Sequence, residues 1–248
     1  MSDFAYGFFY PFRCIPLFFR KPKLILFSIV PVLINLLIYG TIFYFVFSWI
    51  YNTSSNITGA NNPDALFYQE LLHILVLFTT VILLLVICYF FFITIGGIIS
   101  APFNELLSVI VEEELTKIKV VNPRGFFADS WMSIKAEVVK LGFYLSISIP
   151  LFLLNFIPIV GFIFDILNII FSSFYNALDF LDIPMTRREI KLRQKIKITN
   201  SGGMLSYGFG AIAFIIMFVP VINVLLKPLL VVSGTSLFFE KDYLKFYK

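Results

Sequence analysis

The feature that most constrains this chain is the run from Leu24 to Tyr51, which contains no charged side chain. A helix of that length, at about 1.5 Å per residue, exceeds the ~30 Å hydrocarbon thickness of a bilayer. A second apolar run, residues 71–95, is interrupted only by His73. Backbone amides inside a bilayer need partners within the chain, so such runs cross as helices. We therefore predict two long transmembrane helices, 24–51 and 71–95.

Composition extends this prediction to the whole chain, 1–248, as a single all-α integral membrane domain. Hydrophobic residues make up 59% and charged residues only 14%, whereas soluble domains carry about a quarter charged residues. The net charge of +4 is too small to indicate a nucleic-acid partner. Cys14 and Cys88 form no disulfide framework, and a single histidine offers no histidine metal cluster or catalytic triad. We expect neither enzyme activity nor a cofactor or metal.

The distribution of lysine and arginine predicts the orientation. The segment 52–70 contains neither residue, whereas cations precede residue 24 and follow residue 116. The positive-inside rule therefore places both termini in the cytoplasm. The aromatic and basic segment 1–23 fits a helix in the membrane interface. Residues 104–119 form the pattern of an amphipathic surface helix, with Glu112, Glu113 and Glu114 expected on solvated positions.

Two further apolar segments, 141–178 and 203–239, are each divided by a proline-containing turn, at Pro158 and at Pro220. The arms are short and the turns are apolar, so we favour hemi-penetrating helical hairpins, although hairpins that cross fully also return the chain to the cytoplasm. The basic segment 185–200 between them suits anionic lipid headgroups, or simply the topology rule.

The two hairpins resemble an internal repeat, because Asp165 and Lys227 each follow their turn proline by seven residues. An isolated charge at depth costs at least a few kcal/mol. We therefore predict an ion pair between Asp165 and Lys227, acting either as a structural lock or in binding an anion.

Several ordered motifs resemble the CysZ-type sulfate permeases of the wider etoposide-induced-protein-2.4-like family. They are Pro31-Val32-Leu33-Ile34-Asn35, Ala101-Pro102-Phe103-Asn104-Glu105-Leu106-Leu107, Phe156-Ile157-Pro158, Leu181-Asp182-Ile183-Pro184 and the stretch from Phe218 to Pro228. The resemblance implies two long transmembrane helices, two hemi-penetrating helix pairs, homo-oligomer formation and sulfate entry across the bacterial inner membrane for cysteine synthesis.

The chain departs from that family at a Gly-apolar-Arg motif linked with sulfate binding. Here Lys23, Ile25 and Leu26 occupy the corresponding positions. Lys21 and Lys23 lie near a helix N-terminus, which favours anions, but lysine lacks the bidentate fork of arginine. We consider Lys21, Lys23 and Lys227 as candidate anion ligands; for Lys21 and Lys23 the alternative is an ordinary flanking role.

The predicted function is transport of sulfate or a related small inorganic anion, with membrane lipids as the surroundings. The alternative is a structural or interaction protein of the same family without transport activity. A pore requires polar groups that converge between the hairpins. The candidates are Asn35, Asn104, Asn155, Asn168, Ser172 and Asn223.

Overall fold

The computed structural model describes residues 2–58, 66–120 and 125–246, which fold into helices without any strand. These residues group into two compact units, where the sequence predicted one domain. Unit 1 comprises residues 1–30 and 100–248, and unit 2 comprises residues 31–99. Among the described residues, five helices are long and apolar enough to cross a membrane. The prediction of an all-α integral membrane protein is thus confirmed.

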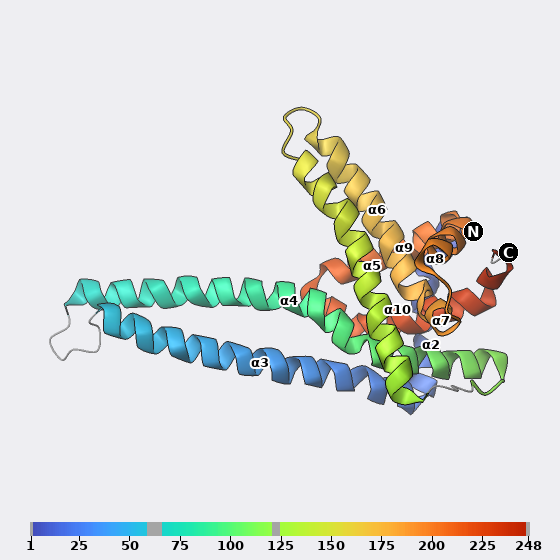
Figure 1. Cartoon of the computed structure of the whole chain (residues 1–248), viewed down its shortest axis with the longest axis horizontal. Helices are drawn as coiled ribbons and strands as arrows, with labels where there is room; N and C mark the ends of the chain where they lie inside the picture. Colours follow the sequence, from blue (N-terminus) through green and yellow to red (C-terminus); the bar gives the residue numbers. More distant parts are fainter. Residues whose placement is uncertain (1, 59–65, 121–124, 247–248) are drawn as a thin grey trace. The chain divides into compact units, whose positions relative to one another are not determined.

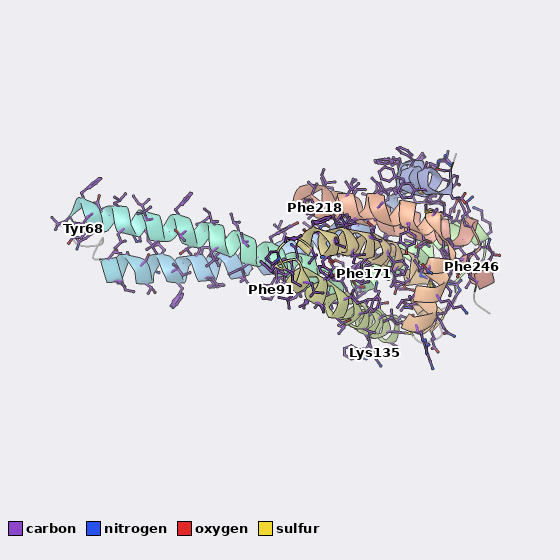
Figure 2. The ribbon with its side chains drawn as sticks, turned by 90° about the horizontal axis from the view of Figure 1, so that it is seen from above. Tyr68, Phe91, Lys135, Phe171, Phe218 and Phe246 are labelled. Carbon is purple, nitrogen blue, oxygen red and sulfur yellow. The ribbon has the colours of Figure 1, made fainter. Side chains whose placement is uncertain are left out.

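Unit 2 consists of parts of α3 (Pro22–Thr58) and α4 (Phe67–Thr116), which run side by side in Figure 1. The Tyr39 hydroxyl donates to the Phe91 carbonyl oxygen at 3.0 Å, and Ser54 Oγ lies 3.1 Å from His73 Nδ1. Figure 2 shows Tyr68 and Phe91 near opposite ends of the α4 part of this unit. Most large side chains of the pair remain exposed, as expected for helices that face lipid.

Helix α4 differs from the sequence prediction because it joins two predicted elements, 71–95 and 104–119. Pro102 lies inside the continuous helix instead of ending it. A proline is tolerated within a membrane helix when neighbouring groups satisfy the freed carbonyl. The amphipathic portion of α4 therefore belongs to unit 1 as a continuation of the apolar helix. The predicted outer segment 52–70 includes residues 59–65, which lie outside the described part of the chain.

Unit 1 contains the two predicted hairpins. Helices α5 (Phe126–Leu154) and α6 (Gly161–Leu181) form the first, and α9 (Met204–Phe218) and α10 (Pro220–Glu240) form the second. Figure 1 shows α5 and α6 side by side up to the turn that joins them. At the first turn Ile159 is 92% exposed, so the tip is apolar as predicted. The depth of the hairpins in a bilayer stays a prediction.

Short helices surround these hairpins. Helices α1 (Asp3–Arg13) and α2 (Ile15–Arg20) form the predicted segment 1–23, and α7 (Ile183–Arg187) and α8 (Leu192–Ser201) form most of 185–200. A 3₁₀ turn, η1 (Tyr243–Phe246), follows α10. Helix α1 packs on α9, where a Cβ on Gly208 would lie 2.1 Å from the Phe4 carbonyl oxygen. Phe9 and Phe12 stay exposed on α1, in keeping with an interfacial helix.

The core of unit 1 lies where α6, α9 and α10 meet. Phe180, Phe209 and Leu230 are almost completely buried there. A Cβ on Gly210 would lie 2.0 Å from the Ser173 carbonyl oxygen of α6, so only glycine permits this helix approach. Small residues at such contacts let apolar helices pack closely in a membrane. This tight packing holds the C-terminal end of α6 in place, and the charged residues of the candidate site begin at that end.

Candidate functional site

The end of α6 and the short helix α7 place Asp182 in the interior of unit 1. The chain turns at Asp182, which precedes α7, and Pro184 occupies the first turn of that helix. Proline suits this position because its missing amide hydrogen is not needed there. The Asp182 side chain is 2% exposed and accepts from Lys140 and from Lys195, each at 3.0 Å. A carboxylate so deeply buried requires these cations.

Lys140 of α5 is the most heavily paired of these cations. Its side chain is 4% exposed, and its Nζ lies 2.9 Å from Glu137, 2.5 Å from Asp179 and 3.0 Å from Asp182. Lys195 of α8 is the last cation of this group, which forms one half of a buried network of ion pairs. It donates to Asp182 and to the Thr186 hydroxyl. Residues from α5, α6, α7 and α8 thus meet through their charges.

Two arginines at the end of α7 form the other half of the network with α4. Arg187 pairs with Glu105 and Glu112, both at 2.5 Å, and Arg188 pairs with the second oxygen of Glu112 at 2.5 Å. Arg187 also donates to the Ser108 hydroxyl at 3.2 Å. The prediction that Glu112 lies on a solvated face is therefore wrong. It is 8% exposed, because the arginine partners draw this face of α4 into the protein.

The electrostatics of the two halves differ. Burial alone would raise the pKa of Asp182, but Lys140 and Lys195 outweigh burial and hold the pKa below its ordinary value. For Glu105 burial prevails over the neighbouring Arg187, so its pKa is raised. Asp182 is thus held as a carboxylate, whereas Glu105 takes up a proton more readily than an exposed glutamate.

A small cavity lies between the two halves of the network. It has a volume of about 20 Å³ and is lined by residues of α4, α5, α6 and α7, including Asn104, Glu105 and Ser133. Glu105 Oε2 and Ser133 Oγ are buried here without a hydrogen-bond partner. A cavity needs roughly 10–15 Å³ to hold one water, which needs polar partners. The cavity fits one water molecule and is too small for a tetrahedral oxyanion.

The charges of the network are nearly balanced. Four cations and five carboxylates take part. They are Lys140, Arg187, Arg188, Lys195, Glu105, Glu112, Glu137, Asp179 and Asp182. Each cation is already bound to at least one carboxylate, so no positive charge is left over for an anion in this conformation. Among the described residues, no group of histidine, cysteine, aspartate or glutamate side chains suits a metal ion.

The candidate anion ligands lie outside this network. Lys21 pairs with Glu114 at 2.8 Å in a half-exposed ion pair, and Lys23 is exposed. The predicted pairing of Asp165 with Lys227 is not among the ion pairs of the described residues and stays a prediction. Asp165 is exposed on α6, and Lys227 is half-buried on α10.

The predicted polar candidates lie on several different helices, and their convergence on one site stays a prediction. Asn104 lines the cavity, whereas Asn35 lies in unit 2, where it donates to the Pro31 carbonyl oxygen at 2.9 Å. Asn223 donates to the Met217 carbonyl oxygen at 3.2 Å. Three others lie along the first hairpin, at its tip and on α6: Asn155, Asn168 and Ser172.

The residues that form the network are not among the site residues predicted from the sequence. Lys140, Arg187 and Lys195 were interpreted as cations that merely flank the hairpins. One signal was available: a basic segment, 185–200, follows directly on Asp182 and Pro184, and acidic residues recur in α4 and α5. Near-equal numbers of both signs next to apolar helices indicate internal pairing as readily as a cytoplasmic loop.

Comparison with known proteins agrees with this architecture. Residues 10–228 match the model of the family described as "Sulfate transporter CysZ/Etoposide-induced protein 2.4". A protein from Vibrio parahaemolyticus named sulfate transporter CysZ is 30% identical over 226 residues, which are 88% of this chain and 87% of the relative. A relative of the same name from Pseudomonas aeruginosa strain LESB58 is 28% identical over 244 residues, 90% of this chain and 89% of its own.

The match to some relatives is shorter. A sulfate transporter CysZ from Pseudomonas fluorescens strain SBW25 is 31% identical over 156 residues, 60% of this chain and 59% of the relative. The aligned part thus spans about three-fifths of that relative's length. The family match nevertheless covers unit 2, the first hairpin, α9, the start of α10 and the whole buried network. The chain belongs to the sulfate transporter CysZ/etoposide-induced protein 2.4 family.

Proposed function

We propose that this protein transports sulfate or a related small inorganic oxyanion across a membrane. The observation that carries the proposal is the buried network of unit 1, in which Lys140, Lys195 and Arg187 lie between apolar helices. The family and the printed names of its relatives support an oxyanion as the substrate. A transporter of this kind needs no catalytic group, so we propose no enzyme activity.

The chemistry of the network suits a tetrahedral oxyanion in a second conformation. A sulfate oxygen and a carboxylate oxygen are interchangeable partners for a guanidinium or ammonium group. Arg187 offers a planar fork that binds two oxygens at once, and at present it holds Glu105 and Glu112. We propose that sulfate displaces carboxylates from these cations as it passes. Since the cavity fits only a water, this exchange requires α4 and α7 to separate.

The finer assignments follow the topology and the resemblance. We propose a bacterial inner membrane with both termini in the cytoplasm, a homo-oligomeric assembly, and a role in supplying sulfur for cysteine synthesis. Lys21 and Lys23 stand at the start of α3, where free helix amides favour anions. We propose that they attract sulfate before it reaches the network, and that Lys227 contributes positive charge beside Glu137.

The test is uptake of radiolabelled sulfate into proteoliposomes that contain the purified protein. We expect uptake well above that of empty liposomes, and a reduced initial rate for the Lys21→Ala/Lys23→Ala double variant at low salt. The exposed double variant Arg193→Gln/Lys197→Gln, which also loses two cations, is the control. A wild-type protein that is folded by circular dichroism but takes up no sulfate would refute the proposed function.

The second candidate function is a structural or interaction protein without transport. The observation that favours it is the closed state of the network, in which each cation already has a carboxylate partner. Under that function the ion pairs only lock α4, α5 and α8 to α7. Sulfate uptake by the wild type at rates above empty liposomes excludes this alternative.

A further inference from the structure

A second pocket lies between α5 and the segment that joins α7 to α8. Its volume is about 410 Å³, within the range of small-molecule sites, roughly 300–1,000 Å³. Four lysines line it: Lys135, Lys140, Lys191 and Lys195. This pocket shares Ala136, Lys140 and Thr186 with the small cavity, so the two spaces adjoin at these residues.

Two of the four lysines carry a charge that no carboxylate of the described residues neutralises. Lys140 and Lys195 are neutralised by Asp182 and its neighbours. Lys135 and Lys191 are exposed and have no ion-pair partner within the described part of the chain. Glu189 is the one carboxylate of the described residues on the pocket wall, so the pocket retains positive charge. Helix α8 also begins here, at Leu192, without a side-chain cap, and its free amides add to the attraction for an anion.

The remainder of the wall is apolar. Met132, Val139, Ile190 and Leu192 line the pocket beside the lysines. Outside the pocket, α5 continues this apolar surface with Trp131, 68% exposed, and Val138, 49% exposed. Tryptophan is enriched at membrane interfaces, where it lies at headgroup level. A ligand that satisfies both parts of this pocket carries an anionic head and an aliphatic chain.

The position of the pocket along the hairpin fits the depth of a lipid headgroup. Lys135 lies on α5 at the end away from the hairpin tip (Figure 2), and about 30 Å of helix separate it from Leu154. This end of α5, opposite the apolar tip, is the end nearer the headgroups whether the hairpin crosses the bilayer or enters it halfway. With the tip directed into the bilayer, the free lysines lie at the level of the phosphates.

We propose that this pocket binds the phosphate group of an anionic phospholipid, held by Lys135 and Lys191 with an acyl chain along Val139 and Val138. The two proposed lipid ligands, Lys135 and Lys191, are not part of the ion-pair network, so lipid binding does not depend on sulfate transport. The lipid contacts α5, α7 and α8 together. It therefore keeps α5 and α8, which carry Lys140 and Lys195, packed together. The bound phospholipid thus stabilises the paired state of the network.

The experiment measures lipid affinity by native mass spectrometry of the purified full chain in detergent micelles. The probes are phosphatidylglycerol, phosphatidylcholine with the same chains, and soluble glycerol 3-phosphate, which has the anion without the chains. The variants are Lys135→Gln/Lys191→Gln and a control of equal charge change, Arg193→Gln/Lys197→Gln. The control residues are exposed on α8 and do not line the pocket.

We expect phosphatidylglycerol to bind the wild type and the control alike, and the pocket variant roughly thirtyfold more weakly, since each lysine near a lipid surface contributes about fivefold. The charge-preserving Lys135→Arg/Lys191→Arg variant retains binding. Equal weakening in the control variant, or equal affinity for phosphatidylcholine, overturns the site. Glycerol 3-phosphate binding as tightly as the lipid overturns the assignment to a phospholipid and indicates a soluble anion instead.

Discussion

Replacement of Lys140 by methionine tests whether the network stabilises unit 1. Lys140 makes ion pairs with Glu137, Asp179 and Asp182 at 2.5–3.0 Å, with its side chain 4% exposed. Methionine keeps an unbranched chain of similar length but removes the charge, so buried carboxylates lose their cation. Breaking a buried ion pair from one side costs about 3–5 kcal/mol. For a chain of this length, 1 kcal/mol lowers the melting temperature by about 2–4 °C, so we expect a decrease of roughly 6–20 °C.

The assay is thermal unfolding in detergent micelles, followed by circular dichroism. The triple variant Lys140→Met/Glu137→Gln/Asp179→Asn removes two of the orphaned carboxylates, while Asp182 keeps Lys195 at 3.0 Å. We expect it to recover at least half of the loss. Lys197→Met, on the exposed side of α8, changes stability by no more than about 0.5 kcal/mol. A Lys140→Met protein that melts within 2 °C of the wild type, where roughly 6 °C or more is expected, refutes the reasoning.

Three further predictions concern acid stability, helix packing and hairpin depth. The pKa of Asp182 is lower in the folded protein than in the unfolded protein. The carboxylate therefore contributes its full stabilisation above the pKa of the unfolded state, and this contribution is lost as the pH falls through the pKa of the folded state. The melting temperature therefore declines below about pH 4, with a smaller slope in Asp182→Asn; equal slopes contradict this. Gly210→Ala, whose Cβ would meet the Ser173 carbonyl oxygen at 2.0 Å, destabilises by about 1–3 kcal/mol. Its control Gly142→Ala, with no atom within 4 Å, is neutral or stabilising, and equal effects refute the packing argument. A cysteine at Ile159, in a Cys88→Ala background, resists an impermeant maleimide from either side of sealed vesicles if the first hairpin penetrates halfway; labelling from the outer side shows that it crosses.

The hairpins could be predicted from the sequence because their signals are local. Pro158 and Pro220 each interrupt a long apolar run near its middle, and proline suits a turn or the first turn of a helix. The structure places the end of α5 at Leu154 and the start of α10 at Pro220. The two long helices were equally evident, since a run without charge needs no knowledge of its partners.

The continuity of α4 could not be predicted from local signals. The change from apolar to charged residues predicts two separate elements, 71–95 and 104–119. In the structure the helix continues, and Glu105 and Glu112 on its later turns contact Arg187. These contacts join residues 75 to 82 positions apart in the chain. Contacts between residues so far apart in the chain determine whether the helix continues, and a short stretch of sequence does not include both partners.

The ion-pair partners were missed for a related reason. Asp165 and Lys227 occupy equivalent positions in the two hairpins, and symmetry suggested that they pair. The two hairpins pack differently, however, because α6 contacts α9 and α10 while its Asp165 face stays exposed. The acids that bind cations instead cluster at the end of α6, where Asp179 and Asp182 follow one another by three residues. Helical spacing puts such residues on one face, and only the fold shows that Lys140 lies opposite.

The most direct test of the account compares sulfate flux through the wild type with flux through an Arg187→Gln/Glu105→Gln double variant in proteoliposomes. The double variant replaces the Arg187–Glu105 ion pair by two neutral glutamine side chains. Neither position is then left with a buried charge whose partner has been removed. We predict that the variant folds with an unchanged helical circular dichroism spectrum and loses at least about 90% of the initial uptake rate, which corresponds to a barrier higher by ~1.4 kcal/mol or more. Uptake by the folded variant at the wild-type rate would contradict passage of sulfate through the network.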